Sequence, residues 1–285
     1  MKTDFYKAFE DKYRGPRELI KTRLRVYEEF ILSVKKIEKN AKALDLGCGR
    51  GEWLEILSEH GFEALGVDSD EYMLNQAKKV GLTVQLGNAI DFLKNVAAES
   101  QIIVSAFHLV EHIPFDSVRE LVQESLRVLC PGGILILETP NPENIVVGSA
   151  NFYLDPTHNK PIPPNLLVFL PEYYGYKKYK ILRLQESKHL ANSPRVKLID
   201  VLNGASPDYA VVAQKDGSKE ALQLTNNAFL KHYGLTIEEL AATYHRGFSA
   251  RWLKNKLKSI IRLDFMTFSR LKSHEVQLGC DDQNF

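Results

Sequence analysis

The sequence contains few cysteines: Cys48, Cys130 and Cys280 lie far apart in a chain of 285 residues. Their spacing fits no metal-binding motif, and three thiols leave at least one unpaired, so we expect reduced cysteines in a cytosolic protein. The sequence also lacks the roughly 20 consecutive apolar residues that span a bilayer, and its charged first residues do not resemble a signal peptide. The formal net charge of +1 gives no electrostatic argument for a nucleic-acid partner. These features predict a cytoplasmic globular protein that does not bind nucleic acid.

Beyond these absences, the sequence alternates short apolar runs with helical patterns between residues 41 and 141. The expected strands are KALDLG, EALGVD, TVQLGN, QIIVSAF and GILILETPN. This alternation predicts right-handed βαβ crossovers and a mostly parallel sheet with helices on both faces. Two later runs, YKILRLQES and DYAVVAQK, have no long helix between them, and we expect them to pair antiparallel at a sheet edge. The predicted fold is therefore an α/β domain with a seven-stranded sheet.

We divide the chain into three parts: an N-terminal helical cap over residues 1–40, an α/β domain over 41–216 and a helical, basic extension over 217–285. Within the α/β domain, residues 141–176 are rich in Pro, Asn and Tyr, and we expect a substrate-facing insertion or lid there. In the extension, the segment from Arg251 to Lys272 has seven Lys or Arg and one Asp, a local net charge of +6. A basic amphipathic helix of this kind packs on its own domain, lies on a membrane surface or docks on a partner.

A glycine-rich loop, ALDLGCGRGEW, joins the first expected strand to the next helix. Gly47, Gly49 and Gly51 allow a tight turn and a close approach of the backbone to a ligand. Dinucleotide-binding enzymes also have glycines at this point, but two details argue against a dinucleotide. The third glycine comes one residue early for that motif, and the Asp45 carboxylate would repel a pyrophosphate. The loop therefore favours a ligand that carries a cationic ammonium or sulfonium group.

Two further strand ends carry polar residues suited to a nucleoside. Asp68 ends the second expected strand, where a carboxylate can accept both hydroxyls of a ribose. Asn88 and Ala89 follow the third strand and can contact the edge of an adenine. Parallel strands end at the same edge of a sheet, so the three motifs together predict one cofactor site.

The motifs DLGCGRG, GVDSD and GNA resemble the three cofactor motifs of class I S-adenosylmethionine-dependent methyltransferases. The resemblance implies a Rossmann-like fold, S-adenosyl-L-methionine as the cofactor and S-adenosyl-L-homocysteine as the product. In that family the loop holds the methionine part, the acid after the second strand binds the ribose, and the end of the third strand holds the adenine. The cofactor-binding residues expected for this chain are Tyr13, Arg14, Arg23, Asp45, Gly47, Gly49, Asp68, Ser69, Met73, Asn88, Ala89, Ile90, His108 and Leu109.

Longer stretches resemble one subfamily, the methyltransferase domain of the WbdD-like enzymes that cap bacterial O-antigen chains. They include FYKAFEDKYRGPRELIKTRL, FHLVEHIP and ETPNPENIVVGSANFYLDPTHNKPIPP. The resemblance implies O-methylation of the non-reducing terminal sugar, on a hydroxyl or on its phosphate, which terminates chain extension in lipopolysaccharide biosynthesis. It also implies a polysaccharide acceptor at the inner face of the cytoplasmic membrane, with the membrane surface or a glycan polymerase as the partner of the basic extension. Some relatives continue into a sugar kinase, whose motifs are missing here.

The segment FHLVEHIP also matches H-x-x-E-H, a zinc-protease pattern in which two helical histidines hold the metal. A zinc helix needs several regular turns to place both histidines on one face, and Pro114 disfavours helical geometry directly after His112. A third ligand on a later helix is not evident. We therefore expect no metal site and a strand-end turn that lines the crevice. The family resemblance implies that Glu111 and His112 of this turn face the acceptor.

The kind of acceptor decides which residues would be catalytic. A sugar hydroxyl loses its proton during attack, and a histidine with a pKa near 7 is suited to remove it. His112 and His158 are the candidates, with His112 preferred. A phosphate oxygen is already anionic and needs cationic side chains that position it, rather than a base. The sequence leaves both acceptors open.

The stretch NFYLDPTH is the expected acceptor-binding loop. Phe152 and Tyr153 can stack on sugar rings, while Asp155 and His158 can hydrogen-bond to hydroxyls. The alternative is an ordered loop in which the aromatic pair is a buried anchor.

Two other functions fit part of the sequence. One is methylation of an unrelated small metabolite, such as a quinone precursor, although the polar and aromatic FYLDPTHNKPIP suits a carbohydrate better. The other is a non-catalytic module that recruits a polymerase through its basic extension, and the intact cofactor motifs argue against it.

Overall fold

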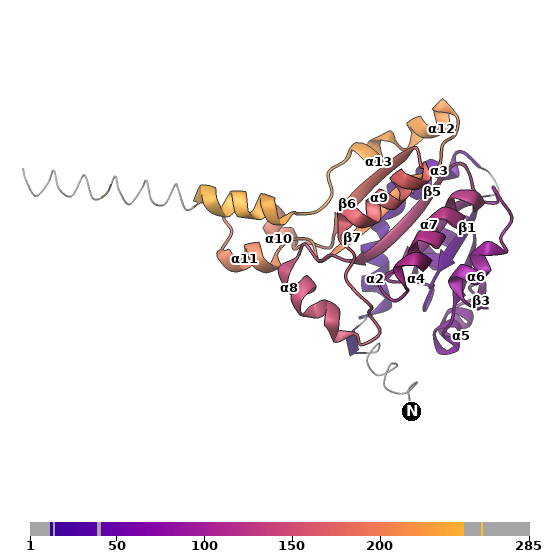
Figure 1. The fold of residues 1–285 in the computed structure, drawn as a ribbon, viewed down its shortest axis with the longest axis horizontal. Coiled ribbons are helices and arrows are strands. Elements are labelled where there is room, and N and C mark those ends of the chain that lie inside the picture. Colours follow the sequence, from indigo (N-terminus) through magenta and orange to yellow (C-terminus); the bar gives the residue numbers. More distant parts are fainter. Residues whose placement is uncertain (1–11, 14, 39–40, 248–257, 259–285) are drawn as a thin grey trace, which may run out of the picture.

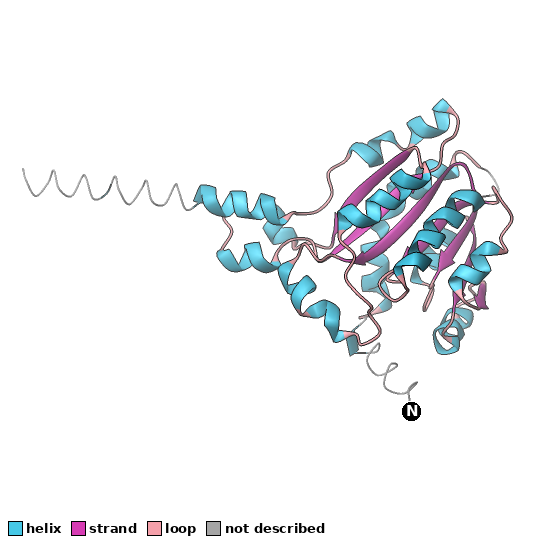
Figure 2. Cartoon of the chain, viewed as in Figure 1, coloured by secondary structure: helices cyan, strands magenta, loops and turns pink. Residues whose placement is uncertain are grey.

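A computed structural model of the protein describes residues 12–13, 15–38, 41–247 and 258. The described part contains a seven-stranded sheet covered by helices on both faces (Figures 1 and 2). The strands are β1 (Lys42–Leu46), β2 (Glu63–Asp68), β3 (Val84–Leu86), β4 (Gln101–Phe107), β5 (Leu129–Pro140), β6 (Lys178–Leu184) and β7 (Asp208–Gln214). Their order across the sheet is β3-β2-β1-β4-β5-β7-β6. Strands β1 to β5 are parallel, and β7 is antiparallel to β5 and to β6. The predicted fold class is confirmed.

The helices fill the connections between these strands. They are α2 (Arg17–Leu24), η1 (Arg25–Tyr27), α3 (Glu28–Lys35), α4 (Glu52–Glu59), α5 (Glu71–Lys79), α6 (Ala89–Lys94), α7 (Phe115–Val128), α8 (Ile145–Ser149), η2 (Asn151–Leu154), α9 (Pro164–Tyr174), α10 (Lys188–Ala191), α11 (Leu198–Asn203), α12 (Lys219–Leu224) and α13 (Asn226–Leu230). Residues 237–247 are also helical.

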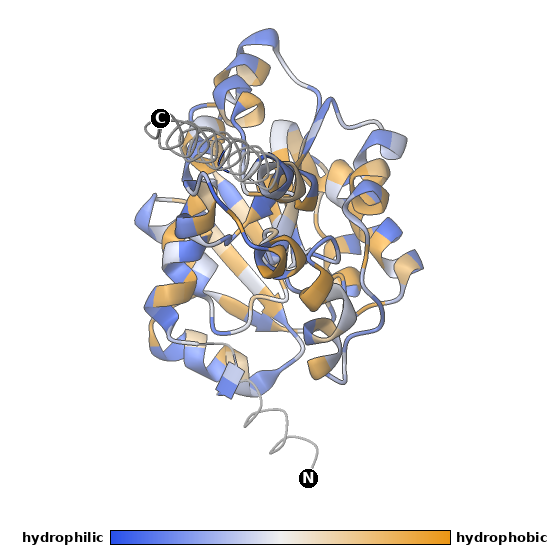
Figure 3. Ribbon diagram, turned by 90° about the vertical axis from the view of Figure 1, so that its left-hand side faces the viewer, coloured by the Kyte–Doolittle hydropathy of each residue, from blue (hydrophilic) through white to orange (hydrophobic). Residues whose placement is uncertain are grey.

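The two faces of the sheet have separate hydrophobic cores because side chains alternate along each strand. In β5, Leu135 and Leu137 pack among residues of α6, α7 and α9, whereas Ile134 and Ile136 pack among residues of α3 and α4. All four side chains are fully buried. In Figure 3 hydrophobic colours run along the strands of the sheet, whereas the helices around it mix hydrophobic and hydrophilic colours. A strand buried on both faces reads as a continuous apolar run, which is why β5 was evident in the sequence.

The expected lid over residues 141–176 proves to be two different structures. Its first half contains the short α8 and η2, and its second half forms α9, which covers the sheet. Pro164 occupies the first turn of α9, where its missing N–H costs nothing. Leu167 and Leu170 are buried against α7, β6 and β7, and Gly175 ends the helix with a φ of 91°. Only the first half of this segment is therefore available to contact a ligand.

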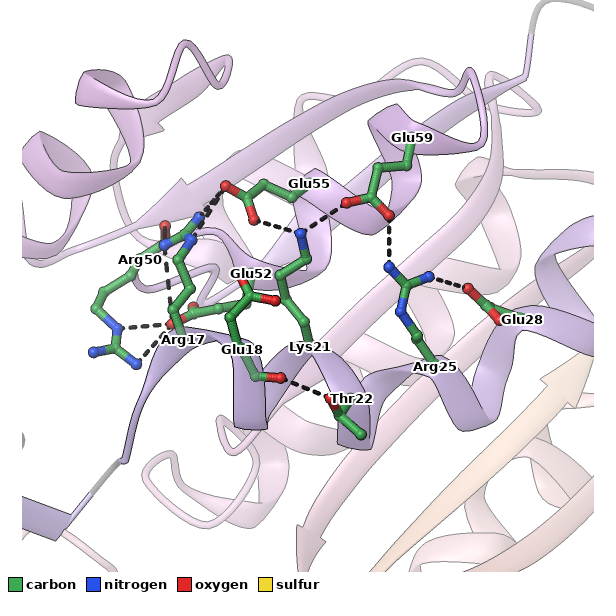
Figure 4. A network of polar contacts seen from close by, with 10 residues as sticks. All are labelled: Arg17, Glu18, Lys21, Thr22, Arg25, Glu28, Arg50, Glu52, Glu55 and Glu59. Carbon is green, nitrogen blue, oxygen red and sulfur yellow. Dashed lines mark hydrogen bonds and ion pairs between the residues drawn. The ribbon is translucent and has the colours of Figure 1, made fainter.

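The N-terminal helix α2 is held on α4 by a network of ion pairs (Figure 4). Arg17 binds Glu55 at 2.9 Å, Lys21 binds Glu55 and Glu59 at 3.0 and 2.7 Å, and Arg25 binds Glu59 at 2.8 Å. Exposed pairs contribute only about 0.2–1 kcal/mol each. Their number and shared partners nevertheless fix where α2 lies, which is over the carboxyl end of β1.

Described residues beyond the predicted boundary at residue 217 pack on the α/β domain, and the division of the chain into three parts stays a prediction. Helix α13 contacts β6, and Phe229 packs edge-to-face on Phe30 of α3, with ring centroids 5.2 Å apart. The predicted basic amphipathic helix, Arg251 to Lys272, lies outside the described residues apart from Lys258. Among the described helices, none combines the length and apolar character that crossing a bilayer requires.

Candidate active site

A cavity of about 690 Å³ lies beyond the carboxyl ends of the central strands, beneath α2 and the loop that contains η2. Its lining includes most of the residues that the sequence predicted for the cofactor and acceptor. These are Tyr13, Arg23, Asp45, Gly47, Gly49, Asp68, Ser69, Met73, Asn88, Ala89, Ile90, His108, Leu109, His112, Asp155 and His158. Arg14 lies outside the described residues. The position agrees with ligand sites in open α/β sheets, and the binding roles of these residues stay predictions.

The loop after β1 has the backbone that its glycines predict. Gly47 and Gly51 have φ values of 72° and 82°, which L-residues with side chains rarely adopt. A Cβ on Gly47 would lie 3.3 Å from a side-chain carbon of Leu109, and a Cβ on Gly51 would lie 2.5 Å from Leu82. The loop is tied to the neighbouring strand because the N–H groups of Gly47 and Cys48 both donate to the carbonyl of Val67. A side chain at either glycine would therefore strain the backbone and crowd the neighbouring leucine.

Asp68 is held in place at the end of β2. One carboxylate oxygen accepts from the N–H of Gly49 at 2.7 Å, and the other accepts from the N–H of Asp70 at 2.8 Å. A carboxylate has about four lone-pair sites, so both oxygens can still accept a ribose hydroxyl. Asn88 has a second function, because its side-chain oxygen caps α6 by accepting from the N–H of Ile90 at 2.9 Å. The arrangement fits the nucleoside cofactor that the motifs predict.

The segment FHLVEHIP does not form a zinc helix. Strand β4 ends at Phe107, and His108 has a φ of 50°, which turns the chain away from helical geometry. The N–H of His108 donates to the carbonyl of Glu138 at 2.9 Å, and helix α7 begins only at Phe115. The left-handed turn sends the side chains of His108 and His112 to different neighbours, and the zinc-protease interpretation is excluded.

His108 lies among buried carboxylates. Its Nδ1 is 3.1 Å from Glu111, and its Nε2 is 3.6 Å from Glu138. Burial lowers the pKa of His108, but hydrogen bonds with Glu111 and Glu138 outweigh it and raise the pKa well above its usual value. Burial raises the pKa of Glu111, but the bond with His108 lowers it below its usual value. At neutral pH the two residues therefore form an imidazolium–carboxylate pair.

Glu111 itself does not reach the cavity, contrary to the prediction that it faces the acceptor. Its side chain is 1% exposed, and its second oxygen accepts from the hydroxyl of Thr139 at 2.9 Å. Both oxygens are thus engaged beneath the surface. Its role in this structure is to hold His108.

His112 has the opposite environment. Its Nδ1 is 2.9 Å from the hydroxyl of Thr157. Burial lowers the pKa of His112 below its usual value, so the ring is neutral at pH 7. The His158 ring lies with its centroid 4.6 Å away, and its Nδ1 is 2.6 Å from the carbonyl of Phe152, to which it donates. Both predicted bases therefore line the cavity with Nδ1 already engaged.

The aromatic pair of the acceptor loop does not form the predicted stacking platform. Phe152 is 2% exposed and packs on the His158 ring, so it is the buried anchor of the loop. Tyr153 is 61% exposed but lies outside the cavity lining. In the 3-10 turn η2, consecutive side chains are about 120° apart, and Phe152 is the one that is buried.

The lining also contains polar residues that the sequence did not predict, among them Glu138, Gln185, Asp208 and Thr157. Glu138 accepts from the hydroxyl of Tyr27 at 2.5 Å and from the amide of Gln185 at 3.1 Å. Burial raises the pKa of Asp208 to about 6. An acid at the end of an apolar strand was the available signal for Glu138. Asp208 begins β7, and only the insertion of β7 between β5 and β6 brings it to the cavity.

The charges around the cavity are unequal. Its carboxylates are Asp45, Glu52, Asp68, Asp70, Glu138, Asp155 and Asp208. Over the described ranges, Arg23 is the one Arg or Lys side chain in the lining. The cavity is therefore suited to cationic or neutral groups rather than to anions.

Two groups of side chains have the composition of a metal site. Ligand atoms of Glu111, His112 and His158 lie within 4.8 Å of one another, and so do those of His108, Glu138 and Asp208. In the first group Glu111 is engaged with His108 and Thr139, and in the second His108 forms an ion pair with Glu138 at 3.6 Å. The expectation of no metal stays a prediction.

Comparisons with known proteins agree with the motifs. A family model described as a methyltransferase domain matches residues 14–167. A solved SAM-dependent methyltransferase from Archaeoglobus fulgidus is 31% identical, covers 74% of this chain and 100% of that chain, and has a TM-score of 0.65. A ubiquinone biosynthesis O-methyltransferase from Leptothrix cholodnii is 29% identical over 140 residues, 46% of this chain and 56% of that protein. The chain thus spans about half the length of the curated relatives it matches.

The resemblance to the O-antigen capping enzymes has weaker structural support. The crystal structure of WbdD is 17% identical, covers 67% of this chain and 39% of that chain, and has a TM-score of 0.48. A similarity of this size carries no argument about the acceptor.

Proposed function

Because the chain belongs to the class I S-adenosylmethionine-dependent methyltransferases and uses S-adenosyl-L-methionine as its cofactor, we propose that it is an O-methyltransferase whose acceptor is a neutral hydroxyl of a carbohydrate. The terminal sugar of a bacterial surface polysaccharide is the acceptor that the sequence resemblance favours. Methylation there would terminate chain extension.

The observation that carries the proposal is the state of His112. Its ring lines the cavity, burial keeps its pKa below the usual value, and Nδ1 is engaged by Thr157. In the neutral tautomer that has its proton on Nδ1, the remaining nitrogen, Nε2, is an unprotonated acceptor. A hydroxyl that attacks a methyl group must lose a proton, and a neutral histidine is the side chain best suited to take it.

The charge of the cavity favours a hydroxyl over a phosphate. A phosphate monoester would bring about two negative charges among seven lining carboxylates, with Arg23 as the one Arg or Lys of the described lining. Recognition of phosphate normally uses several cationic donors, often in bidentate pairs. A neutral hydroxyl avoids this repulsion.

The polarity of the cavity supports a carbohydrate. Glu138, Gln185 and Asp208 line it on the side of β5, β6 and β7, away from the glycine loop. Carboxylate and amide groups of this kind accept hydrogen bonds from several hydroxyls at once. On the other side, Asp155 and His158 come from the loop after η2.

When bound, S-adenosyl-L-methionine supplies a methyl group on a positively charged sulfur. The residues of this chain then have three tasks. The glycine loop and Asp68 fix the cofactor position, α2 and the loop after η2 limit the access of water, and His112 accepts the proton of the hydroxyl at Nε2. The acceptor oxygen must lie in line with the methyl group and the sulfur, so positioning contributes most of the rate.

A second candidate acceptor is a hydroxylated aromatic ring. Several relatives at about 30% identity are named ubiquinone biosynthesis O-methyltransferases, and Phe107, Ile113 and Leu154 add apolar surface to the cavity. His112 would act in the same way on a phenol. The two acceptors differ in the number of hydroxyls that the β5–β7 side of the cavity would bind.

The deciding experiment supplies methyl-labelled S-adenosyl-L-methionine and three acceptors: an oligosaccharide with a free non-reducing end, the same oligosaccharide phosphorylated there, and a catechol. We expect label on the free oligosaccharide. Label on the phosphorylated one alone would contradict a hydroxyl acceptor, and label on the catechol alone would establish the second candidate. Asp68→Ala, which should not bind the cofactor, is the control for non-enzymatic transfer.

A further inference from the structure

We propose that Asp155 and Thr157 form a hydrogen-bonded relay that holds His112 in the tautomer with its proton on Nδ1 and its lone pair on Nε2. The inference rests on the proposed function of His112 as the base. It assigns to Thr157 a positioning role and gives Asp155 a task other than the predicted contact with the acceptor.

The direction of each hydrogen bond follows from the number of protons available. The hydroxyl of Thr157 has one proton, and it lies 2.6 Å from the Asp155 carboxylate and 2.9 Å from Nδ1 of His112. An ionised carboxylate can only accept, so the hydroxyl donates to Asp155. Its lone pairs are then left for Nδ1, which must carry the proton and donate. The same logic orients the histidine of serine proteases through a carboxylate.

The relay is fixed to the rest of the site at both ends. The N–H of Thr157 donates to the Asp155 carboxylate at 2.8 Å, and the N–H of Asn159 donates to the carbonyl of Glu111 at 2.8 Å. The second bond ties the loop after η2 directly to the turn that carries His112. Phe152 anchors the start of this loop in the core. Thr157 is itself exposed, and its backbone bond to Asp155 together with the bond from Asn159 to Glu111 holds it facing His112.

The acid end of the relay is buried, whereas Thr157 is exposed. Asp155 is 9% exposed, so its hydrogen bonds act in a medium of low dielectric and are stronger than in water. The charged and titratable groups that face His112 are Glu111, His158, Asp155 and His108. None of these groups bonds Nδ1 in the described structure, where that position belongs to Thr157. Without the hydroxyl, the neutral ring is free to move its proton to Nε2, which can then no longer accept a proton.

The direct test measures the tautomer. Thr157→Val keeps the branched shape but removes the hydroxyl, and Thr157→Ser keeps the hydroxyl. In the holoenzyme labelled with 15N-histidine, we expect the nitrogen shifts of His112 to show the Nδ1–H form in the wild type and in Thr157→Ser. We expect a mixture or the Nε2–H form in Thr157→Val. An unchanged tautomer in Thr157→Val would overturn the relay.

Activity provides the second readout. At a saturating concentration of the acceptor, Thr157→Val should lower kcat about 10- to 100-fold. This is less than the roughly 10²–10⁴-fold that general-base catalysis contributes in full. The affinity for S-adenosyl-L-methionine should not change, and Thr157→Ser should restore most of kcat. If the tautomer changes and kcat does not, the relay stands and the role of His112 as a base fails. If kcat falls equally in both variants, the hydroxyl is not the cause and the relay is wrong.

Discussion

His108 and His112 are four residues apart at the end of one strand, yet their surroundings put them in opposite charge states. His108 lies between Glu111 and Glu138, which hold it as a cation. His112 lies against the hydroxyl of Thr157, and burial keeps it neutral. The left-handed backbone of His108 separates them. The difference shows that the pattern H-x-x-E-H carries no fixed chemistry, because the turn decides which neighbours each ring meets.

The largest effect should come from removing the neutral histidine. His112→Ala should lower kcat by about 10²–10⁴-fold, since a base in hydrogen-bond reach contributes about that much, without changing the affinity for the cofactor. The matched control is His158→Ala, for which we expect a loss of about tenfold or less. Steady-state kinetics with a saturating acceptor and calorimetry of cofactor binding separate the two parameters. A larger loss in His158→Ala would exchange the roles of the two rings.

The cationic His108 should contribute more to the stability of the fold than the neutral His112. His108→Gln leaves Glu111 buried without its counter-ion, and we expect the free energy of unfolding at pH 7 to fall by about 2 kcal/mol. This is less than the 3–5 kcal/mol typical of a fully buried pair, because the His108 side chain is 46% exposed at the cavity. Urea denaturation compares it with His112→Gln, which should cost less than about 1 kcal/mol. Equal losses would mean that the two environments do not differ as described.

The pH dependence of the free energy of unfolding should show the titration of Asp208, the acid beside His108. The pKa of Asp208 is raised from 3.8 to about 6 in the folded protein, so the folded state binds this proton more tightly than the unfolded state. Asp208 therefore makes stability fall as pH rises from about 4 to about 6. Asp208→Asn should remove this slope and raise the free energy of unfolding by about 1 kcal/mol at pH 8, with no gain at pH 4.

That effect of Asp208→Asn is smaller than the full pKa shift would give, because a buried asparagine amide also has a desolvation cost of its own. Urea denaturation from pH 4 to pH 8 provides the measurement. A gain at pH 4 as large as that at pH 8 would exclude titration of Asp208 as the cause.

The smallest expected effect is that of a chelator. The described side chains offer two groups of metal-ligand composition, but the proposed chemistry needs only hydrogen bonds at both. Incubation with EDTA should therefore leave kcat within about twofold. A loss that added zinc or magnesium restores would show that one of the two groups binds a metal, and His108→Gln and His112→Ala would identify which.

The cofactor half of the site was predictable because each of its motifs is local. A glycine loop, an acid and an asparagine follow β1, β2 and β3, and parallel strands that end at one edge bring these motifs together in any such sheet. Gly47, Asp68 and Asn88 accordingly lie where the sequence predicted them. The acceptor half of the site was harder to predict from the sequence. Glu111 was predicted to face the acceptor, and Phe152 either to stack on a sugar ring or to anchor the loop, and both are buried.

The sequence by itself determined the fold class, the seven strands and the cofactor motifs, because periodicity and short spacings encode these features. Only the tertiary structure decided the charges of His108 and His112, the arrival of Asp208 at the cavity and the contact between Thr157 and His112. Each of these features depends on groups that are far apart in the chain. Asp208 interacts electrostatically with His108, and Thr157 hydrogen-bonds to His112. The protonation of His108, His112 and Asp208 follows from burial and from hydrogen bonds, and both exist only after the strands and loops have packed.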